Sequence, residues 1–368
     1  MPTRVLVAGG GTGGHVFPAL AIAEAIRRHD SDVEIRFSGT VGGLEARAVP
    51  QAGYLLEMIE VVGLKRGLHP DLFKFPLMLL RGILSSLILV IRFRPHVVIC
   101  TGGYVSGPVG ISAWIWGCPL VLQEQNSLPG ITTRVLSRVS RQIFLAYEEA
   151  VPRVGGRERL IVGNPTRPGL DRIGRAEARS RFGLDPERPT LFVMGGSQGA
   201  AGINLAVGDA LEQLVAKDLQ VLWQSGSLHY EQAISAAAAW QSRVRVEPFI
   251  QNISDAYSTA DLVIARSGAN SISELNLLGV PSILVPLPTS AENHQAFNAR
   301  VQVDSGAAAM IPESRLSGER LANEVFDLID DRERLKAMAA NSLSLAKPDA
   351  AGRIWAAMEG AGLFQGCV

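Results

Sequence analysis

A glycine-rich turn near the amino terminus places the strongest constraint on how this chain folds. Residues 9–15 read GGGTGGH and follow a short apolar run, 4–8, that is typical of a β-strand. Leu20, Ala23 and Ile26 then recur at helical spacing. The sequence therefore predicts a strand that is joined through glycines to the amino terminus of a helix.

This turn has the chemistry of a phosphate site. The first N–H groups of a helix lack partners and carry partial positive charge, and glycine lets a diphosphate approach the backbone. His15 leaves the turn at the helix entrance, beside whatever binds there. The alternative is that the glycines only let the helix pack closely on the sheet.

The same glycines raise the question of NAD binding. Gly9, Gly11 and Gly14 fit the dinucleotide pattern G-x-G-x-x-G. That pattern requires an acidic residue at the end of the second strand, where it binds a ribose. The second strand-like run, 33–37, is followed by Ser-Gly-Thr at 38–40, so NAD binding is disfavoured.

Strand-like runs alternate with helical patterns along all 368 residues, which is typical of βαβ units and parallel sheets. The runs are 4–8, 33–37, 55–59, 97–100, 120–123, 143–145, 190–194, 221–224, 244–246, 262–264, 282–285 and 307–310. We therefore predict an α/β protein with two doubly wound, Rossmann-like domains, at 1–163 and 164–345. A terminal helix within 346–368 is expected to pack back on the first domain.

Composition narrows the class of protein. The 35 basic and 35 acidic side chains give a formal charge of zero, which argues against nucleic-acid partners. The three cysteines show neither a disulfide framework nor metal spacing. Because no signal peptide is recognised either, a reducing cytoplasm is expected.

The segment 61–96 departs from this neutral balance. Its charged residues are Lys65, Arg66, Lys74, Arg81, Arg92 and Arg94, with one acid, Asp71. Apolar side chains flanked by cations favour the surface of an anionic membrane. The alternative is a long core helix whose basic ends are solvated. Much of 84–91 is expected to be core, since a βαβ crossover is needed here.

A second glycine loop, GGSQGA at 195–200, follows the strand-like run 190–194. Its N–H groups and the hydroxyl of Ser197 suit phosphate oxygens. Glu274 falls in the second turn of a later helix, where a carboxylate suits a ribose diol or is simply solvated. Metal-ligand spacing, a nucleophile elbow and a Walker lysine are all absent from the sequence.

Six motifs occur together and in order: GGTGGHVFP at 10–18, GGYVSGP at 102–108, EQN at 124–126, GNP at 163–165, GGSQGA at 195–200 and RSGANSISE at 266–274. With this set the chain resembles the MurG family of peptidoglycan glycosyltransferases, in glycosyltransferase family 28, over roughly residues 4–345. The resemblance implies the GT-B fold and inverting transfer of N-acetylglucosamine from UDP-N-acetylglucosamine to the muramyl sugar of undecaprenyl-pyrophosphoryl-MurNAc-pentapeptide, lipid I. The product would be lipid II, with no cofactor and no metal.

The resemblance also implies the site residues. Donor-binding positions are Thr12, Gly13, Gly14, Asn126, Arg167, Gly196, Ser197, Gln198, Ile250, Glu274, His294 and Gln295. Acceptor-side positions are Gly11, Thr12, Gly13, Gly14, His15, Tyr104 and Asn126. Arg167 and Ile250 would flank the uracil, and Ser197 would meet the diphosphate. Glu274 would bind the ribose, and Gln295 the transferred sugar.

Two residues, His15 and Glu124, are candidates for the catalytic base. A sugar hydroxyl is a poor nucleophile, so a base must take its proton during attack. Imidazole suits this role near neutral pH, and a carboxylate at the end of a strand is its rival. Gln123 stands where some family members have histidine, and His294 where some have glutamine.

Peripheral attachment to the cytoplasmic face of the inner membrane, through 72–94, is also implied, with other cell-wall synthesis proteins as partners.

The residues alone leave three other functions open: a UDP-sugar epimerase, an NAD-dependent oxidoreductase and a non-catalytic sensor of UDP-sugars at the membrane. Release of UDP from UDP-N-acetylglucosamine in the presence of a lipid I analogue distinguishes transfer from all three.

Overall fold

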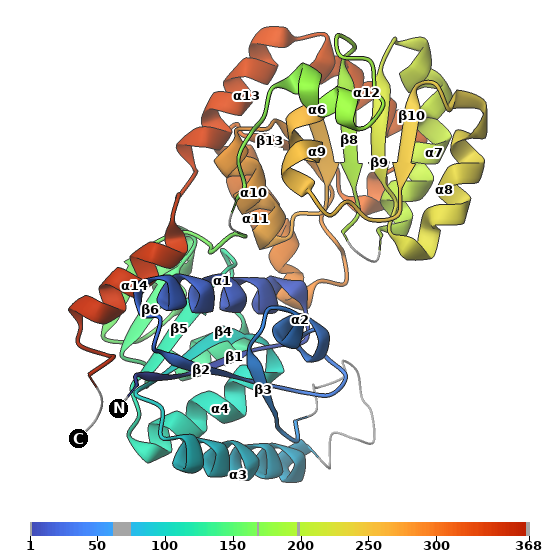
Figure 1. Ribbon diagram of the computed structural model, residues 1–368. Helices are drawn as coiled ribbons and strands as arrows, with labels where there is room; N and C mark the ends of the chain where they lie inside the picture. Colours follow the sequence, from blue (N-terminus) through green and yellow to red (C-terminus); the bar gives the residue numbers. More distant parts are fainter. Residues whose placement is uncertain (1, 62–74, 168, 197–198, 366–368) are drawn as a thin grey trace. The chain divides into compact units, whose positions relative to one another are not determined.

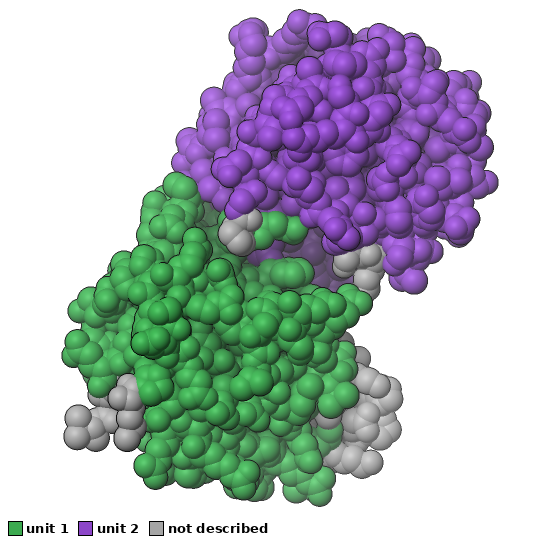
Figure 2. Space-filling model, in the orientation of Figure 1, with its two compact units in different colours: residues 1–168, 347–368 green, residues 169–346 purple. Residues whose placement is uncertain are grey.

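The computed structural model describes residues 2–61, 75–167, 169–196 and 199–365 (Figure 1). The chain divides into two compact units, coloured separately in Figure 2. Unit 1 comprises residues 1–168 and 347–368, and unit 2 comprises 169–346. Each unit contains one sheet whose paired strands are all parallel, as the alternating pattern of the sequence predicts.

Unit 1 is built on a seven-stranded sheet in the order β3-β2-β1-β4-β5-β6-β7. Its strands are β1 (Arg4–Gly9), β2 (Glu34–Gly39), β3 (Leu55–Met58), β4 (Val97–Gly102), β5 (Leu120–Glu124), β6 (Gln142–Leu145) and β7 (Glu158–Ile161). Its helices are α1 (Gly13–His29), α2 (Glu45–Gln51), α3 (Phe75–Phe93), α4 (Gly103–Trp116), α5 (Ile131–Leu136), the 3-10 helix η2 (Glu148–Arg153) and α14 (Ala350–Gly360).

Unit 2 is built on a six-stranded sheet in the order β10-β9-β8-β11-β12-β13. Its strands are β8 (Thr190–Met194), β9 (Gln220–Gln224), β10 (Val244–Glu247), β11 (Leu262–Ala265), β12 (Ser282–Leu284) and β13 (Ala308–Met310). Its α-helices are α6 (Arg175–Arg181), α7 (Ala201–Ala216), α8 (Tyr230–Ala237), α9 (Ile253–Thr259), α10 (Ala269–Leu278), α11 (His294–Asp304), α12 (Gly318–Ile329) and α13 (Arg332–Ser344). Its 3-10 helices are η3 (Ser227–His229), η4 (Ala238–Trp240), η5 (Ala291–Asn293) and η6 (Glu313–Arg315).

Both sheets are covered on two faces, and the alternation of side chains along the central strands explains why. In β1, Val5 and Val7 join a core with α1 and α14, whereas Leu6 and Ala8 join the core under α3 and α4. In β8, Leu191 packs toward α7 and α12 on one face. These strands are therefore apolar throughout, as strands buried on both faces must be.

The strand order reverses once in each sheet, and both glycine loops lie at that point. In unit 1 the reversal falls between β1 and β4, and in unit 2 between β8 and β11. The loop at 9–13 follows β1, and the loop that begins at Gly195 follows β8. Ligands of open parallel sheets bind at the carboxyl ends of strands where the order reverses.

The division of the chain lies slightly after the boundary predicted at 163/164, because residues 164–167 contact unit 1. The Asn164 Oδ1 accepts a hydrogen bond from Gln123 Nε2 at 3.3 Å. The Arg167 guanidinium lies over the ring of Phe17, 6.0 Å from its centroid. Arg167, predicted with the second domain, is therefore grouped with the first.

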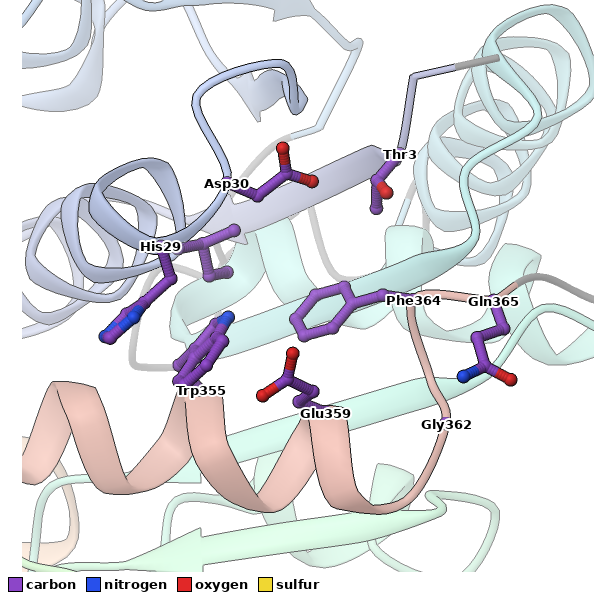
Figure 3. A pocket seen from close by; sticks show the side chains of 9 residues that line it. Thr3, His29, Asp30, Trp355, Glu359, Gly362, Phe364 and Gln365 are labelled. Atoms are coloured by element: carbon purple, nitrogen blue, oxygen red, sulfur yellow. The ribbon is translucent and has the colours of Figure 1, made fainter.

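The terminal helix α14 packs against α1 in unit 1 (Figure 1). Ile354 and Met358 enter the core beside α1. The rings of His29 and Trp355 stack, with centroids 3.7 Å apart and planes 7° apart. Both rings line a cavity of about 260 Å³ that Phe364 also borders (Figure 3).

Helix α3 crosses the face of unit 1 beside α4, and the Ser112 hydroxyl of α4 donates to the Ile83 carbonyl at 3.0 Å. The side of α3 that faces away from α4 is apolar and exposed. The exposed residues are Leu77, Leu80, Leu84, Ile88 and Ile91, at helical spacing. The expectation that 84–91 is mostly core is therefore wrong for Leu84 and Ile88, which are 51% and 50% exposed.

Candidate active site

Unit 1 brings the first glycine loop against the turn between β4 and α4. Gly11 adopts the left-handed conformation, with φ 87°, and the carbonyl of Thr12 accepts the backbone N–H of His15 at 3.1 Å. A Cβ atom on Gly102 would lie 2.7 Å from His15 Nδ1, and one on Gly103 would overlap the Gly10 carbonyl. The two glycines of GGYVSGP therefore make room for the loop and for the imidazole.

The contacts of His15 determine its tautomer. Its Nδ1 lies 3.0 Å from the carbonyl oxygen of Thr101 and 3.1 Å from Gln125 Oε1. A carbonyl oxygen only accepts, so Nδ1 carries the proton in the neutral ring and Nε2 carries the lone pair. The half-buried imidazole is thus set up to accept a proton at Nε2.

A chain of buried side-chain amides holds this arrangement. Gln125 Nε2 donates to the Thr101 carbonyl at 2.6 Å and to Gln123 Oε1, and Gln123 Nε2 donates to Asn164. The sequence placed Gln123 and Gln125 at the end of a strand but did not predict that they bond to each other or to His15. The EQN and GNP motifs contain two members of the chain, Gln125 and Asn164, which Gln123 links. The pairing of β4 with β5 brings Gln125 near Thr101.

Glu124 is 3% exposed, and its oxygens are occupied by the turn that follows β5. Oε1 accepts the backbone N–H and the side-chain amide of Asn126, both at 3.1 Å, and Oε2 accepts the N–H of Gly130 at 3.2 Å. With these three hydrogen bonds, the carboxylate of Glu124 closes the turn that follows β5. They also bring Asn126, a predicted site residue, to the end of β5.

Unit 2 places the second glycine loop at the start of α7. Ser197 and Gln198 lie outside the described residues. Gly196 and Gly199 adopt left-handed conformations, and a Cβ on Gly199 would overlap the Ser225 carbonyl. The strand-to-helix turn therefore requires glycine, and it ends at the first residue of a 16-residue helix.

Gln224, at the end of β9, joins this loop to Ile250. Its Nε2 donates to the Gly196 carbonyl at 3.4 Å, and its Oε1 accepts the backbone N–H of Ile250 at 3.0 Å. Two predicted donor residues are thus brought together by a side chain that the sequence did not reveal. The polar end of an otherwise apolar strand was the one available signal.

Glu274, on α10, is 4% exposed, so the alternative of a solvated helix acid is wrong. Its Oε2 accepts a hydrogen bond from the Tyr257 hydroxyl at 3.0 Å, and Tyr257 is itself fully buried. A buried carboxylate needs such donors, because desolvation penalises an ionised group that lacks them. Tyr257, on α9, is a second residue that the sequence did not reveal.

Replacing Tyr257 by phenylalanine removes this donor without changing the shape of the ring. We expect UDP-N-acetylglucosamine affinity to fall by about 0.5–1.5 kcal/mol, the usual net value of one hydrogen bond. Calorimetric titration of donor into the folded variant measures the change. An affinity equal to that of the wild type would mean that Tyr257 does not orient a donor-binding carboxylate.

Gln295 and His294 begin α11. Gln295 Oε1 accepts the N–H of Leu287 at 2.9 Å, which leaves its amide nitrogen as the donating end of the side chain. His294 Nδ1 lies 2.7 Å from the Ala291 carbonyl. Arg266, the first residue of the RSGANSISE motif, forms a bidentate ion pair with Glu313, at 2.8 and 3.0 Å. This ion pair fixes the position of the start of the motif.

The predicted residues thus fall into two local sets. Unit 1 groups Gly11, Thr12, Gly13, Gly14, His15, Tyr104, Glu124 and Asn126 around the ends of β1, β4 and β5, and Arg167 over Phe17 of α1. Unit 2 groups Gly196, Ile250, Glu274, His294 and Gln295 around the ends of β8 to β12. Their roles toward donor and acceptor stay predictions. Among the described residues, no cluster of three His, Cys, Asp or Glu side chains suits a metal ion.

Two family models match the chain. The glycosyltransferase family 28 N-terminal domain matches residues 5–145, and the C-terminal domain of the same family matches residues 190–354. The chain belongs to glycosyltransferase family 28. It is therefore a glycosyltransferase, and the GT-B expectation is confirmed together with the two parallel α/β domains.

Curated relatives and a solved structure agree with this assignment. Proteins from Moorella thermoacetica and Desulfitobacterium hafniense are 42% and 40% identical, and cover 94% and 95% of this chain and 96% and 97% of their own. Both are named UDP-N-acetylglucosamine–N-acetylmuramyl-(pentapeptide) pyrophosphoryl-undecaprenol N-acetylglucosamine transferase. The crystal structure of Acinetobacter baumannii MurG matches with a TM-score of 0.80 and 28% identity, over 98% of this chain and all of that one.

Proposed function

We propose that this family 28 glycosyltransferase transfers N-acetylglucosamine from UDP-N-acetylglucosamine to the muramyl sugar of lipid I, forming lipid II. The ordered motifs and the names of the full-length relatives support this substrate pair. The observation that carries the chemistry is the contact between His15 Nδ1 and the Thr101 carbonyl, since it leaves Nε2 as a proton acceptor.

In the proposed reaction, the acceptor hydroxyl oxygen attacks the anomeric carbon as the bond from that carbon to the diphosphate breaks. The electron pair leaves with UDP, and the hydroxyl proton passes to His15 Nε2. Attack opposite the leaving group inverts the anomeric configuration. Glu124 is the weaker candidate for the base, because three donors already occupy its oxygens.

Stabilisation of the leaving diphosphate is assigned to unit 2. The amino terminus of α7 presents its first backbone N–H groups after the turn from β8, and we assign to them the negative charge that grows on the diphosphate during transfer. Glu274 is proposed to accept the ribose hydroxyls, in an orientation held by Tyr257. Arg167 and Ile250 are proposed for the uracil, and His294 and Gln295 for the sugar. The other donor positions proposed in unit 1 are Thr12, Gly13, Gly14 and Asn126.

The test is a coupled assay for UDP in which UDP-N-acetylglucosamine is mixed with a lipid I analogue. Acceptor-dependent UDP release together with a new disaccharide product supports transfer. UDP release or sugar isomerisation without acceptor would indicate an epimerase instead. Donor binding with no turnover would indicate a sensor, and either result would overturn the proposed function.

The exposed apolar stripe of α3 supports a further proposal, that unit 1 attaches to the membrane at its surface. By length and composition, 76–93 qualifies as a membrane-crossing helix, yet α3 packs along α4 within the fold. Trp114, Ile115 and Trp116 at the end of α4 are also exposed, as are Ile131 and Val135 on the neighbouring α5. Exposed apolar residues on three neighbouring helices indicate an interaction site.

Cations border this apolar surface. Arg81 lies within the stripe of α3, Arg92 and Arg94 follow at its end, and all three are exposed. Arg138, Arg141 and Arg157 line a cavity of about 500 Å³ that Trp114 also borders. Lys65, Arg66, Lys74 and the start of the predicted segment 72–94 lie outside the described residues.

We further propose the cytoplasmic face of the inner membrane as the location, with other cell-wall synthesis proteins as partners.

Replacing Arg81, Arg92 and Arg94 with glutamine is expected to weaken binding to vesicles that contain phosphatidylglycerol. Each cation near an anionic surface contributes up to about 1 kcal/mol. Vesicle sedimentation measures the change, while activity on a water-soluble acceptor should persist. Neutralising Arg315, Arg332 and Arg334, exposed on unit 2, is the matched control. Equal vesicle binding by both variants would mean that this surface does not face the membrane.

A further inference from the structure

Glu45, the first residue of α2, is the most completely buried carboxylate near the first glycine loop, with 0% exposure. None of the ion pairs found within the described parts of the chain involves it. Burial of a carboxylate without a cation is costly unless hydrogen bonds replace its water. Neither the reaction proposed above nor any predicted site residue accounts for Glu45.

The two oxygens of Glu45 accept three hydrogen bonds. Oε2 accepts the backbone N–H of Gly11 at 2.8 Å, inside the first glycine loop. Oε1 accepts the backbone N–H of Thr40 at 3.1 Å and its hydroxyl at 2.9 Å. The carboxylate therefore links the loop after β1 to the loop after β2.

Three glycines leave the space that this carboxylate fills. A Cβ atom on Gly10 would lie 2.6 Å from Oε1, one on Gly39 would lie 2.5 Å from the Glu45 Cγ, and one on Gly43 would overlap both oxygens. Gly10 and the N–H of Gly11 are thus committed to Glu45. The N–H of Gly11, a predicted acceptor-side residue, therefore does not face a phosphate.

The network extends to Tyr104 with a definite direction. The Thr40 hydroxyl donates to Glu45, so at 3.1 Å it accepts from the hydroxyl of Tyr104. The ring of Tyr104 also covers Gly11, where a Cβ atom would lie 2.9 Å from Cε1. Gly11 and Tyr104, two predicted acceptor-side residues, are therefore held by the same carboxylate.

We propose that Glu45 is a positioning residue of the acceptor side of the site. Its carboxylate holds Gly11 in the left-handed conformation from which Thr12 and His15 follow, and it orients the phenol of Tyr104 through Thr40. The proposal rests on the proposed function in assigning this loop to the glycosyl acceptor. The network itself can be tested without any turnover.

The first test is amide hydrogen exchange of the full chain with Glu45→Gln. The variant keeps the shape but turns one oxygen into an N–H₂ group that faces a donor. Exchange in the peptide spanning 9–14 is expected to rise about 10-fold or more, the loss of one charge-assisted hydrogen bond. Glu57→Gln, on β3, removes a 40%-exposed carboxylate that pairs with Arg36, and serves as the matched control. Unchanged exchange at 9–14 would overturn the proposal.

The second test separates acceptor from donor kinetics. Glu45→Gln is expected to lower kcat/KM for the lipid I analogue by up to about 10²-fold, as misplaced reacting groups do, while donor affinity falls much less, because the donor contacts proposed in unit 2 are unchanged. An equal loss for donor and acceptor, or none, would overturn the proposal. If Glu45→Gln fails to fold, Thr40→Val is expected to show the same selective loss, because it removes the hydroxyl that donates to Glu45 and links it to Tyr104 but keeps the hydrogen bond to Gly11. A wild type that is inactive with lipid I would instead refute the proposed function and leave the exchange result standing.

Discussion

Replacing His15 with alanine is expected to lower kcat by roughly 10²–10⁴-fold, the usual contribution of acid–base catalysis. The imidazole donates from Nδ1 to the Thr101 carbonyl, so its loss removes the proposed proton acceptor at Nε2. Donor affinity should stay nearly unchanged, because Glu274 and the second glycine loop belong to unit 2. Steady-state kinetics and donor titration by calorimetry measure the two effects separately.

The pH dependence of the rate gives this prediction its sharpest form. A base works only when it is unprotonated, so an enzyme that depends on one loses rate on the acidic side of its pH profile. His15→Ala should lose that acidic limb. Glu124→Gln is the comparison, since it changes the rival carboxylate. A loss of tenfold or less in His15→Ala, with the acidic limb intact, would move the assignment to Glu124.

Replacing Glu274 with alanine is expected to weaken UDP-N-acetylglucosamine binding by about 1–3 kcal/mol, the cost of leaving buried partners unsatisfied. The carboxylate is 4% exposed and Tyr257 donates to it, so its removal affects both the proposed ribose contact and the Tyr257 hydroxyl. Calorimetric titration of donor gives the affinity. A thermal unfolding scan verifies that the variant is folded.

Glu333→Ala, on α13, is the matched control for this prediction, because it removes an 83%-exposed carboxylate that pairs with Lys336. It should bind donor like the wild type. If folded Glu274→Ala also binds like the wild type, the buried carboxylate has a structural role and the ribose site lies elsewhere. The smaller effect expected for Tyr257→Phe should then vanish as well.

Local patterns were sufficient for the architecture. Each predicted strand-like run is a strand within about two residues of its expected ends, because burial on both faces requires continuous apolar runs that glycine and polar turns interrupt. The loops at 9–14 and 195–200 were recognised because glycine before a helix is a local signal. The order of six motifs was enough to indicate family 28, since each is a continuous stretch of sequence.

Contacts between distant residues required the tertiary structure. Glu45 bonds to Gly11, 34 positions away, and Gln125 contacts His15, 110 positions away. These pairs become neighbours only through the order of the strands. For the same reason Gly10 and Gly39 resemble ordinary turn glycines in the sequence, although they leave room for a carboxylate. Burial is also a property of packing. Leu84 was expected in the core and is exposed, whereas the carboxylate of Glu274 is buried. The sequence does not reveal this, because the neighbouring helices decide which side of a helix is covered.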